Sequence, residues 1–257
     1  MQKTVLISGG LGDIGKAIAI LFCNVGYNVS ISDLLSPIDA EPLLAEMRAN
    51  GCTGLSYHKV NVSVESEVLA WIDAVAEKWG SPQVIVANAG IVVAGEFSDS
   101  NLKTDDVKKQ MDVNFWGSYY LTVHASRKLK QEALPGRIVF IGSWAAERPA
   151  TRIASYCVSK AAVRMLCKTL ALELANDDIL VNEVAPGIVE GGLAKQNQQK
   201  NPALLKTHLD STPTHALVST KEVAKHVLRL CDFEDMSITG STILVDGGLS
   251  LTSKMTP

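Results

Sequence analysis

The chain has 257 residues, of which 47% are hydrophobic and 20% are charged, and its formal net charge at pH 7 is −3. This length and composition fit a globular protein with one large domain or two small ones. The slight negative charge excludes a strongly basic field for nucleic acid or an anionic membrane surface. The apolar runs are too short to cross a bilayer.

Short apolar segments alternate with longer segments of helical periodicity along the whole chain. Several short segments are unbroken runs of Val, Ile and Leu, which is typical of strands covered on both sheet faces. The alternation predicts an α/β fold, with a doubly wound, mainly parallel seven-stranded sheet and helices on both faces, in one domain over residues 1–257. The predicted strands are 5–8, 29–33, 56–62, 84–88, 137–143, 180–185 and 242–246, and the predicted helices are about 13–25, 40–50, 64–79, 104–131, 154–176 and 220–232.

Residues 190–215 interrupt this rhythm, because they have weak periodicity and many polar side chains. An insertion of this length late in an α/β domain is more often functional than idle. We therefore predict a loop or helix that covers a substrate. A surface loop without a function is the alternative.

The cysteines and the N-terminus bear on the compartment. The cysteines are odd in number and form no Cys-x-x-Cys pair, which predicts free, mostly buried thiols in a reducing compartment. The first residues lack a signal-peptide pattern, so we expect a cytoplasmic protein. The five histidines show no metal-ligand spacing, which predicts no zinc site. The cysteines are Cys23, Cys52, Cys157, Cys167 and Cys231.

A glycine-rich turn lies between the first predicted strand and the first predicted helix. Gly10-x-Gly12-x-x-Gly15 satisfies the dinucleotide fingerprint in that position. Glycines let the backbone approach a pyrophosphate, and the helix N-terminus offers N–H groups and the positive end of a dipole. A glycine turn used only for packing is the alternative, and its position in the chain disfavours it.

Asp33 ends the second predicted strand, 18 residues after Gly15. An acid at this point can accept hydrogen bonds from both hydroxyls of an adenosine ribose and would repel a 2′-phosphate. Neither Leu34 nor Leu35 supplies a compensating cation. The sequence therefore favours NAD over NADP.

Tyr156 and Lys160 are four residues apart in a predicted helix, and Ser143 lies thirteen residues upstream. Helical residues four apart project from the same face. A lysine ammonium beside a phenol favours the phenolate and lowers its pKa, which would suit Tyr156 to acid–base chemistry. Ser143 could hydrogen-bond the oxygen that gains or loses the proton. An exposed helix pair without a function is the alternative.

Together these features resemble the short-chain dehydrogenase/reductase family, over nearly all of residues 3–249. The family's catalytic serine, tyrosine and lysine match Ser143, Tyr156 and Lys160, and its helix asparagine matches Asn114. The remaining matches are Ser8-Gly9-x-x-x-Asp13-Ile14-Gly15, Asn88-Ala89-Gly90, Pro186-Gly187-Ile188-Val189 and Val245-Asp246-Gly247-Gly248.

The resemblance implies hydride transfer between a secondary alcohol carbon and NAD, with proton transfer through Tyr156. Lys160 would lower the pKa of Tyr156 and bind the nicotinamide ribose. Ser143 would hold the substrate oxygen, and Asn114 would hold a water that links Lys160 to solvent. The implied cofactor site comprises Gly9, Leu11, Gly12, Asp13, Ile14, Gly15, Asp33, Leu34, Asn61, Val62, Asn88, Ala89, Gly90, Tyr156, Lys160, Pro186, Gly187 and Val189.

Three residues depart from the family pattern. Asp13 replaces a glycine. It could cap the helix with its carboxylate turned from the phosphates; a carboxylate pointed inward would instead weaken cofactor binding by charge repulsion. Asn61 stands where the family usually has Asp, and its amide can still contact adenine. Gly191 stands where the family commonly has a threonine that touches the nicotinamide amide, so that contact is absent. None of these changes removes a reacting group.

Two other functions stay open. An epimerase or lyase would use bound NAD transiently, although such relatives usually carry a longer C-terminal substrate domain. A non-enzymatic NAD sensor can keep the glycine loop while losing the tyrosine or the lysine, and this sequence keeps both. An oxidoreductase is the function that the residues favour.

The substrate is predicted to be small and polar, such as a polyol, sugar or hydroxy acid. The predicted substrate residues are Ser143, Trp144, Glu147 and Tyr156. Arg148 or Arg152 could anchor a carboxylate, and Glu190, His208 and His215 lie in or near the predicted covering segment.

Segments 104–131 and 154–176 carry apolar residues on more than one face, which predicts a second packing partner. We expect pairing between subunits in a homotetramer or homodimer; deeper burial within one subunit is the alternative.

Overall fold

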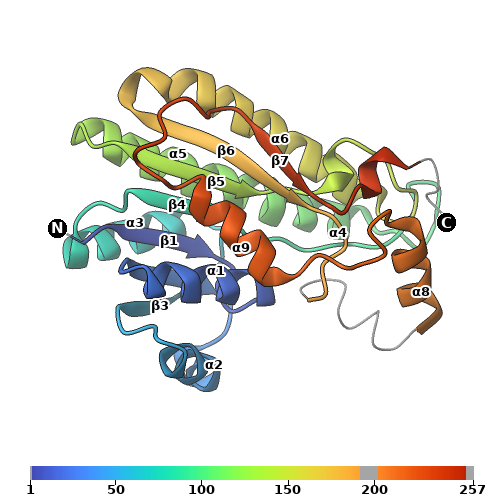
Figure 1. Cartoon of the computed structure of the whole chain (residues 1–257), viewed down its shortest axis with the longest axis horizontal. Helices are drawn as coiled ribbons and strands as arrows, with labels where there is room; N and C mark the ends of the chain where they lie inside the picture. The colour runs from blue at the N-terminus through green and yellow to red at the C-terminus, as the bar shows by residue number, and fades with distance from the viewer. Residues whose placement is uncertain (1, 192–201, 253–257) are drawn as a thin grey trace.

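A seven-stranded parallel sheet forms the centre of the molecule (Figure 1). The computed structural model describes residues 2–191 and 202–252. The strand order is β3-β2-β1-β4-β5-β6-β7, and every neighbouring pair is parallel. The strands are β1 (Thr4–Ser8), β2 (Asn28–Asp33), β3 (Leu55–Lys59), β4 (Val84–Ala87), β5 (Gly136–Ile141), β6 (Ile179–Pro186) and β7 (Thr242–Val245).

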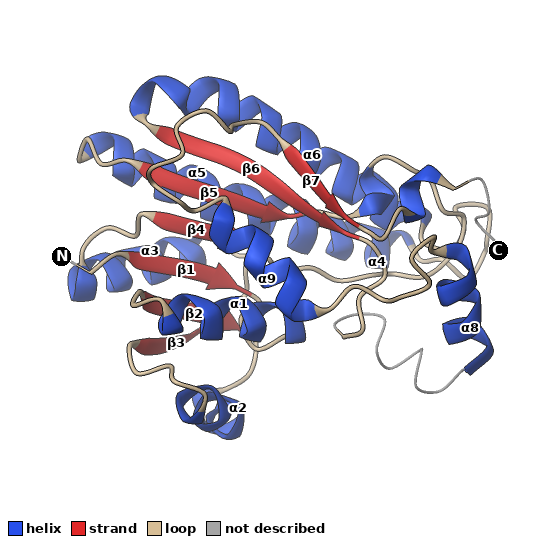
Figure 2. Ribbon diagram, in the orientation of Figure 1, coloured by secondary structure: helices blue, strands red, loops and turns tan. Residues whose placement is uncertain are grey.

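Helices cover both faces of this sheet (Figure 2). On one face, α1 (Asp13–Asn24), α2 (Pro37–Ala49) and α9 (Thr220–Arg229) share an apolar cluster with the strands. On the other face lie α3 (Glu65–Trp79), α5 (Gly117–Gln131) and α6 (Ala154–Leu174). A π-helical segment, Asp112–Trp116, joins α4 (Thr104–Met111) to α5, and α8 (Pro202–Ser211) lies beyond the carboxyl ends of the strands.

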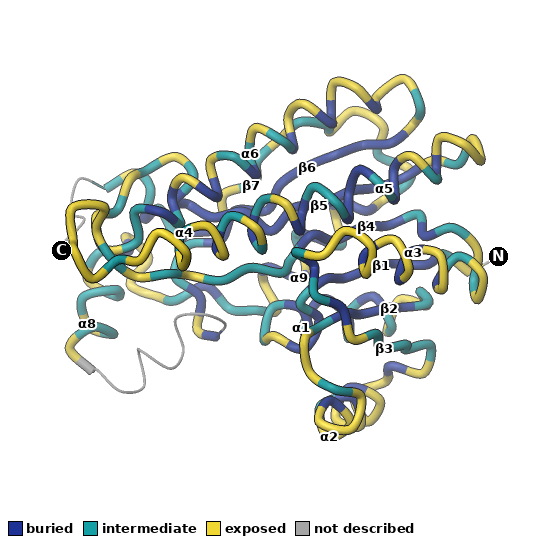
Figure 3. The backbone as a smooth tube through the Cα atoms, turned by 180° about the vertical axis from the view of Figure 1, so that it is seen from behind, coloured by how far each residue is buried: buried dark blue, intermediate teal, exposed yellow. Residues whose placement is uncertain are grey.

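The fold class and the elements are confirmed in type and order. Strands β1, β4, β5 and β6 are buried along their whole length, which explains their mainly apolar sequences (Figure 3). The predicted helix 104–131 is continuous in space but changes its hydrogen-bonding pattern at the π-helical segment. Such segments are frequent at functional sites.

The order of the strands reverses between β1 and β4, because β2 and β3 lie on one side and β5 to β7 on the other. In an open α/β sheet, ligands bind outside the carboxyl ends of the strands at this switch point. The glycine turn after β1 and the Asn88-Ala89-Gly90 segment after β4 both lie there. The fold thus places two distant motifs side by side.

The prediction that all five cysteines are free was wrong. Cys23, near the end of α1, and Cys52, in the turn after α2, form a disulfide with their Cα atoms 4.9 Å apart. Sequence spacing could not reveal this pair, because 29 positions separate the two residues and only the folded chain brings the end of α1 next to the turn after α2. Cys157, Cys167 and Cys231 are free and buried, as predicted.

Among the described helices, none is long and apolar enough to cross a membrane.

Candidate active site

The glycine turn and the end of β4 are bonded to each other. Asn88 donates from its side-chain nitrogen to the carbonyl oxygens of Ser8 and Gly9, at 2.9 and 3.0 Å. Gly9 has a φ of +64°, and a Cβ there would come within 2.9 Å of the Cα of Ala89. Glycine is therefore required where the turn bends against the neighbouring strand. Gly15 is equally confined, because a Cβ would overlap the carbonyl oxygen of Gly9.

The turn leads into α1 with Gly12 as its N-cap, and within the described chain no side chain caps this helix by a hydrogen bond. The first-turn N–H groups of an α-helix have no partner inside the helix. An uncapped N-terminus beside a glycine turn fits the pyrophosphate of a dinucleotide. Ile14 is partly buried against the core cluster, so we expect it to contribute to such a site mainly through its backbone.

Of the two orientations left open for Asp13, capping of α1 is wrong, because Asp13 is the first residue inside the helix and Gly12 is its N-cap. Its side chain lies 3.7 Å from Lys16 and faces Gly191. A Cβ on Gly191 would come within 3.1 Å of both the Cβ and Oδ2 of Asp13. Two of the departures from the family pattern, Asp13 and Gly191, are therefore neighbours. The family's glycine is enlarged to Asp at position 13, and its threonine is reduced to Gly at position 191.

Asp33 lies at the end of β2, beside the glycine turn. Its Oδ2 accepts the backbone N–H of Leu11 at 3.1 Å, and its Oδ1 accepts that of Leu34 at 2.8 Å. A carboxylate has about four acceptor positions. Two of them fix its orientation here, and the others suit a pair of ribose hydroxyls.

Asn61 and Val62 follow β3, which ends at Lys59 rather than at the predicted residue 62. The side-chain oxygen of Asn61 accepts bonds from the backbone and hydroxyl of Ser63, so the loop itself uses this acceptor. Val62 is buried against Gly117.

The predicted cofactor residues after β6 are held by backbone contacts. Gly187, which follows Pro186, donates its N–H to the Val245 carbonyl at 2.9 Å, and the buried Val189 forms a β-bridge to Val218.

Ser143, Tyr156 and Lys160 come together at the carboxyl ends of β4 and β5. The Ser143 hydroxyl accepts the N–H of Ala145 at 3.1 Å and lies close enough to the Tyr156 hydroxyl to act to lower its pKa. Lys160 is buried, donates to the Ile141 carbonyl at 2.8 Å, and lies 5.7 Å from the centre of the Tyr156 ring. A Cβ on Gly90 would lie 3.6 Å from the Lys160 nitrogen, so the β4 segment borders the same space.

Burial controls the proton affinities of this group. It raises the pKa of Tyr156 to about 12, although the hydrogen bond from Ser143 acts in the opposite direction. It lowers the pKa of Lys160 to about 8, and the negative charge of Glu183 opposes that change. The expected lowering of the Tyr156 pKa is therefore not what this structure gives, because desolvation outweighs the stabilisation of the phenolate.

Asn114 lies in the π-helical segment and is fully buried. Its side chain accepts the N–H of Ile91 at 2.8 Å and donates to the Ile91 carbonyl at 3.0 Å and to Ser159 at 2.9 Å. Gln110, one helical turn earlier, accepts the N–H of Val93 and donates to Ser155 at 3.0 Å. The two amides thus join the loop after β4 to α6.

Gln110, Ser155 and Ser159 were missed by the sequence analysis. The signal that could have found them is periodicity, because Gln110 precedes Asn114 by one helical turn and Ser155 precedes Ser159 by one turn. Polar residues repeated at that spacing in otherwise buried helices predict partners in a neighbouring helix.

The predicted substrate residues divide into two kinds. Trp144 is buried in a small apolar cluster that Tyr156 and Ile188 contact, so it can form a wall of the site. Glu147 is exposed, and its carboxylate lies 3.4 Å from Arg164. Arg148 donates to the carbonyl oxygens of Leu249, Ser250 and Thr252, which makes it a poor anchor for a substrate carboxylate.

The predicted covering segment is described only in part, and residues 192–201 lie outside the described residues. Pro213 and Thr214 pack against the turn at Gly247 and Gly248. His208 is half-buried, and burial lowers its pKa. Glu190 is exposed, as are Arg152 and His215.

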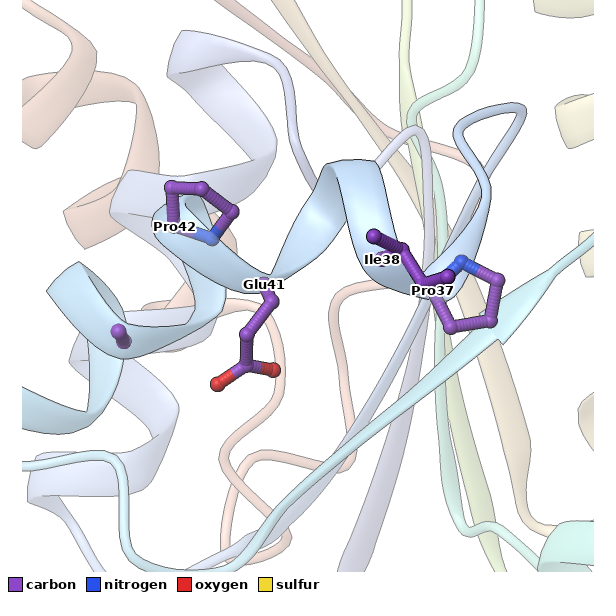
Figure 4. A pocket seen from close by; sticks show the side chains of 5 residues that line it. Pro37, Ile38, Glu41 and Pro42 are labelled. Carbon is purple, nitrogen blue, oxygen red and sulfur yellow. The ribbon is translucent and has the colours of Figure 1, made fainter.

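A shallow hollow on the outer side of α2 is separate from this site (Figure 4). The hollow is lined by Pro37, Ile38, Glu41, Pro42 and Ala45. Helix α2 packs beside β3 at the edge of the sheet, and this lining offers one carboxylate and no acid–base pair. In the described chain, no group of three His, Cys, Asp or Glu side chains could hold a metal ion.

Known proteins resemble this chain over nearly its whole length, at about three identical residues in ten. A family model described as enoyl-(acyl carrier protein) reductase matches residues 11–250. Glucose 1-dehydrogenase 2 of Bacillus subtilis is 29% identical over 251 residues, covering 97% of this chain and 95% of that protein. A short-chain dehydrogenase/reductase of Armillaria gallica is 31% identical over 252 residues, covering 96% of this chain and 95% of that protein.

A solved structure agrees with these sequence matches. A gluconate 5-dehydrogenase from Burkholderia cenocepacia, in complex with NADP and tartrate, superposes with a TM-score of 0.89 at 26% identity, covering 98% of this chain and 97% of that one. The fold is thus that of the Rossmann-type oxidoreductases. The chain belongs to the short-chain dehydrogenase/reductase family.

Proposed function

We propose that this protein is an NAD-dependent oxidoreductase that interconverts a secondary alcohol and a ketone, with Tyr156 as the acid–base residue. The observation that carries the proposal is the meeting of Ser143, Tyr156 and Lys160 at the carboxyl ends of β4 and β5, beside the switch point of the sheet. Bound NAD would accept or supply the hydride. The protein itself has to bind and orient the substrate and the cofactor, and it has to transfer one proton.

The proton is held at the hydroxyl oxygen of Tyr156. A pKa of about 12 keeps this phenol protonated near neutral pH, so it can donate to a carbonyl oxygen within hydrogen-bond reach. Ser143 would hold the same substrate oxygen and stabilise its developing charge. Lys160 would hydrogen-bond the nicotinamide ribose and act on Tyr156 as a nearby positive charge.

Asn114 lies beside Lys160 and would support the proton transfer indirectly. Its side-chain amide is committed to Ile91 and Ser159, so its direct action is to position the loop after β4. A water linking Lys160 to solvent would have to use the main-chain carbonyl of Asn114, which also accepts the Ser118 hydroxyl at 2.7 Å.

We propose NAD rather than NADP as the cofactor. The support is the oriented carboxylate of Asp33 beside the exposed, uncharged Leu34, which would repel a 2′-phosphate. The gluconate 5-dehydrogenase was solved with NADP, so relatives alone do not decide the choice. Isothermal titration of both cofactors should give tighter binding of NAD, and Asp33→Ala should shrink the difference. Tighter binding of NADP by the wild type would contradict this assignment.

We propose a small polar substrate, such as a polyol, sugar or hydroxy acid, and a single domain in which part of 190–215 covers it. The names of the glucose and gluconate relatives support this class. We further propose a cytoplasmic homotetramer or homodimer, without nucleic-acid or membrane partners. Exposed apolar side chains on α6, including Met165 and Leu172, and Trp116 before α5 support the assembly.

The test is a screen of polyols, sugars and hydroxy acids with NAD and NADP in parallel. The readout is the absorbance of the reduced nicotinamide. We expect turnover with NAD, and Tyr156→Phe should lower kcat about 10²- to 10⁴-fold. Binding of NAD without turnover of any alcohol or ketone would favour a sensor. Unchanged turnover by Tyr156→Phe would refute the mechanism.

A further inference from the structure

A buried ion pair lies directly beneath Ser143. Glu183 on β6 is 0% exposed, and Arg164 on α6 binds both of its oxygens: Nε donates to Oε2 at 2.7 Å and Nη2 to Oε1 at 3.2 Å. Thr242 on β7 also donates to Oε2, at 2.6 Å. The carboxylate is therefore fixed by three hydrogen bonds from two elements.

The same pair contacts the chain on both sides of the Ser143 side chain. Nη2 of Arg164 donates to the Ser143 carbonyl at 3.1 Å, and Nη1 lies 3.4 Å from a carboxylate oxygen of Glu147. The carboxylate of Glu183 lies against Gly142, where any Cβ would overlap Oε1. The segment that carries the Ser143 hydroxyl is thus confined by the guanidinium and by the carboxylate.

Helix α6 connects this pair to the proton-transfer group. Tyr156, Lys160 and Arg164 follow one another at intervals of four residues, so they project from one face of the helix. Any rotation of α6 relative to the Gly142–Ser143 segment would strain the bond from Arg164 to the Ser143 carbonyl. The pair therefore relates the position of Ser143 to that of Tyr156.

A role in binding substrate fits Arg164 less well. Its side chain is 12% exposed. Its Nε and both hydrogens of Nη2 are engaged by Glu183 and the Ser143 carbonyl, and Nη1 faces Glu147. Little of its hydrogen-bonding capacity remains for a ligand.

We propose that Arg164 and Glu183 are positioning residues that hold the Ser143 hydroxyl at hydrogen-bond distance from Tyr156. The proposal rests on the proposed function, in which Ser143 and Tyr156 act on the same substrate oxygen. A buried ion pair is weak evidence for stability, because well-packed neutral residues often replace one without loss. Positioning can therefore be separated from folding by experiment.

The first experiment needs no substrate. Hydrogen–deuterium exchange is measured over residues 141–147 in the wild type and in the neutral pair Arg164→Met with Glu183→Gln. We expect exchange at least tenfold faster in the variant over this segment and unchanged over β1. The matched control, Lys130→Met with Asp177→Asn, removes a partly exposed ion pair at 2.8 Å just past the C-terminal end of α6. Unchanged exchange over 141–147 in the neutral pair would overturn the proposal.

The second experiment is a double-mutant cycle on kcat, with the panel substrate that gives the highest turnover. The neutral pair should lower kcat about 10- to 100-fold, since small misplacements of catalytic groups have effects of that size. The KM for NAD should change less than twofold. In a Ser143→Ala background the same neutral pair should lower kcat less than twofold, because the group that it positions is gone.

The cycle separates two kinds of failure. If Ser143→Ala alone leaves kcat unchanged, the proposed function is wrong about this serine. If Ser143→Ala lowers kcat and the neutral pair lowers it by the same factor in both backgrounds, the pair does not act through Ser143. Should the neutral pair fail to fold, Arg164→Lys takes its place, since lysine keeps the charge but cannot reproduce the fork. A wild-type kcat in Arg164→Lys would then overturn the proposal.

Discussion

Helix α6 is held from two sides by different chemistry. On the side of α4, the neutral side chains of Gln110 and Asn114 bond Ser155 and Ser159. On the side of β6, the charged pair of Arg164 and Glu183 is buried beside the chain at Ser143. Both arrangements join the helix that carries Tyr156 to a loop at the end of a strand.

The difference lies in what each arrangement costs when it is broken. A neutral hydrogen bond contributes about 1 kcal/mol net, and an unsatisfied buried partner costs about 1–3 kcal/mol. Separating a buried ion pair costs about 3–5 kcal/mol, because one charge is left without compensation. Substitutions on the charged side should therefore lower the free energy of unfolding more than those on the neutral side. Lys160 lies near both sides, and its pKa should depend on the charge of Glu183.

The largest effect is expected from Gly142→Ala. The new Cβ would overlap the Glu183 carboxylate and push it from Arg164, so the free energy of unfolding should fall by about 3–5 kcal/mol. Gly136→Ala, at the other end of β5 from Gly142, is the matched control, and its Cβ would meet a methyl group of Leu129. The control should lose about 1–3 kcal/mol. Equal losses in urea denaturation would show that the charged side is no more demanding than ordinary packing.

The pH dependence of stability should reveal Lys160. Its pKa is about 8 in the folded protein and 10.5 in the unfolded chain, so between these values the unfolded chain binds the additional proton. Stability attributable to Lys160 therefore rises with pH across this window, by about 3 kcal/mol in total. Tyr156 acts with the opposite sign above pH 10, because its folded pKa is raised.

The measurement is the difference in unfolding free energy between the wild type and Lys160→Met at several pH values. The Tyr156 contribution and those of the buried thiols largely cancel in this difference. Parallel curves from pH 7 to about 10 would contradict the lowered pKa of Lys160.

A smaller effect is expected from Gln110→Leu on the neutral side. The substitution leaves the buried N–H of Val93 and the hydroxyl of Ser155 without their partner, which should cost about 1–3 kcal/mol. Gln131→Leu, at the exposed end of α5, is the control and should change stability by no more than about 0.5 kcal/mol. A loss as large as that of Gly142→Ala would remove the distinction between the two sides.

The sequence predicts one part of this arrangement and not the other, for a physical reason. The strands and helices follow from local periodicity, and Ser143, Tyr156 and Lys160 follow from a family pattern. In the sequence, Arg164 has the pattern of an exposed helix cation, and Glu183 is a charged residue within an otherwise mainly apolar strand. Their meaning depends on α6 crossing β6, which is a non-local contact. Cys23 and Cys52 were misjudged for the same reason.

The smallest effect should come from Ser159→Ala. The Asn114 amide would lose one acceptor but keep its bond to the Ile91 carbonyl, so no buried group is left wholly unpaired. The expected loss is about 1 kcal/mol, measured by urea denaturation beside Gln110→Leu. If the two losses are equal, the amides and hydroxyls act as one cooperative network rather than as separate bonds. The neutral side chains would then stabilise α6 as one unit, as the ion pair does. The two sides would differ only in whether the group is charged.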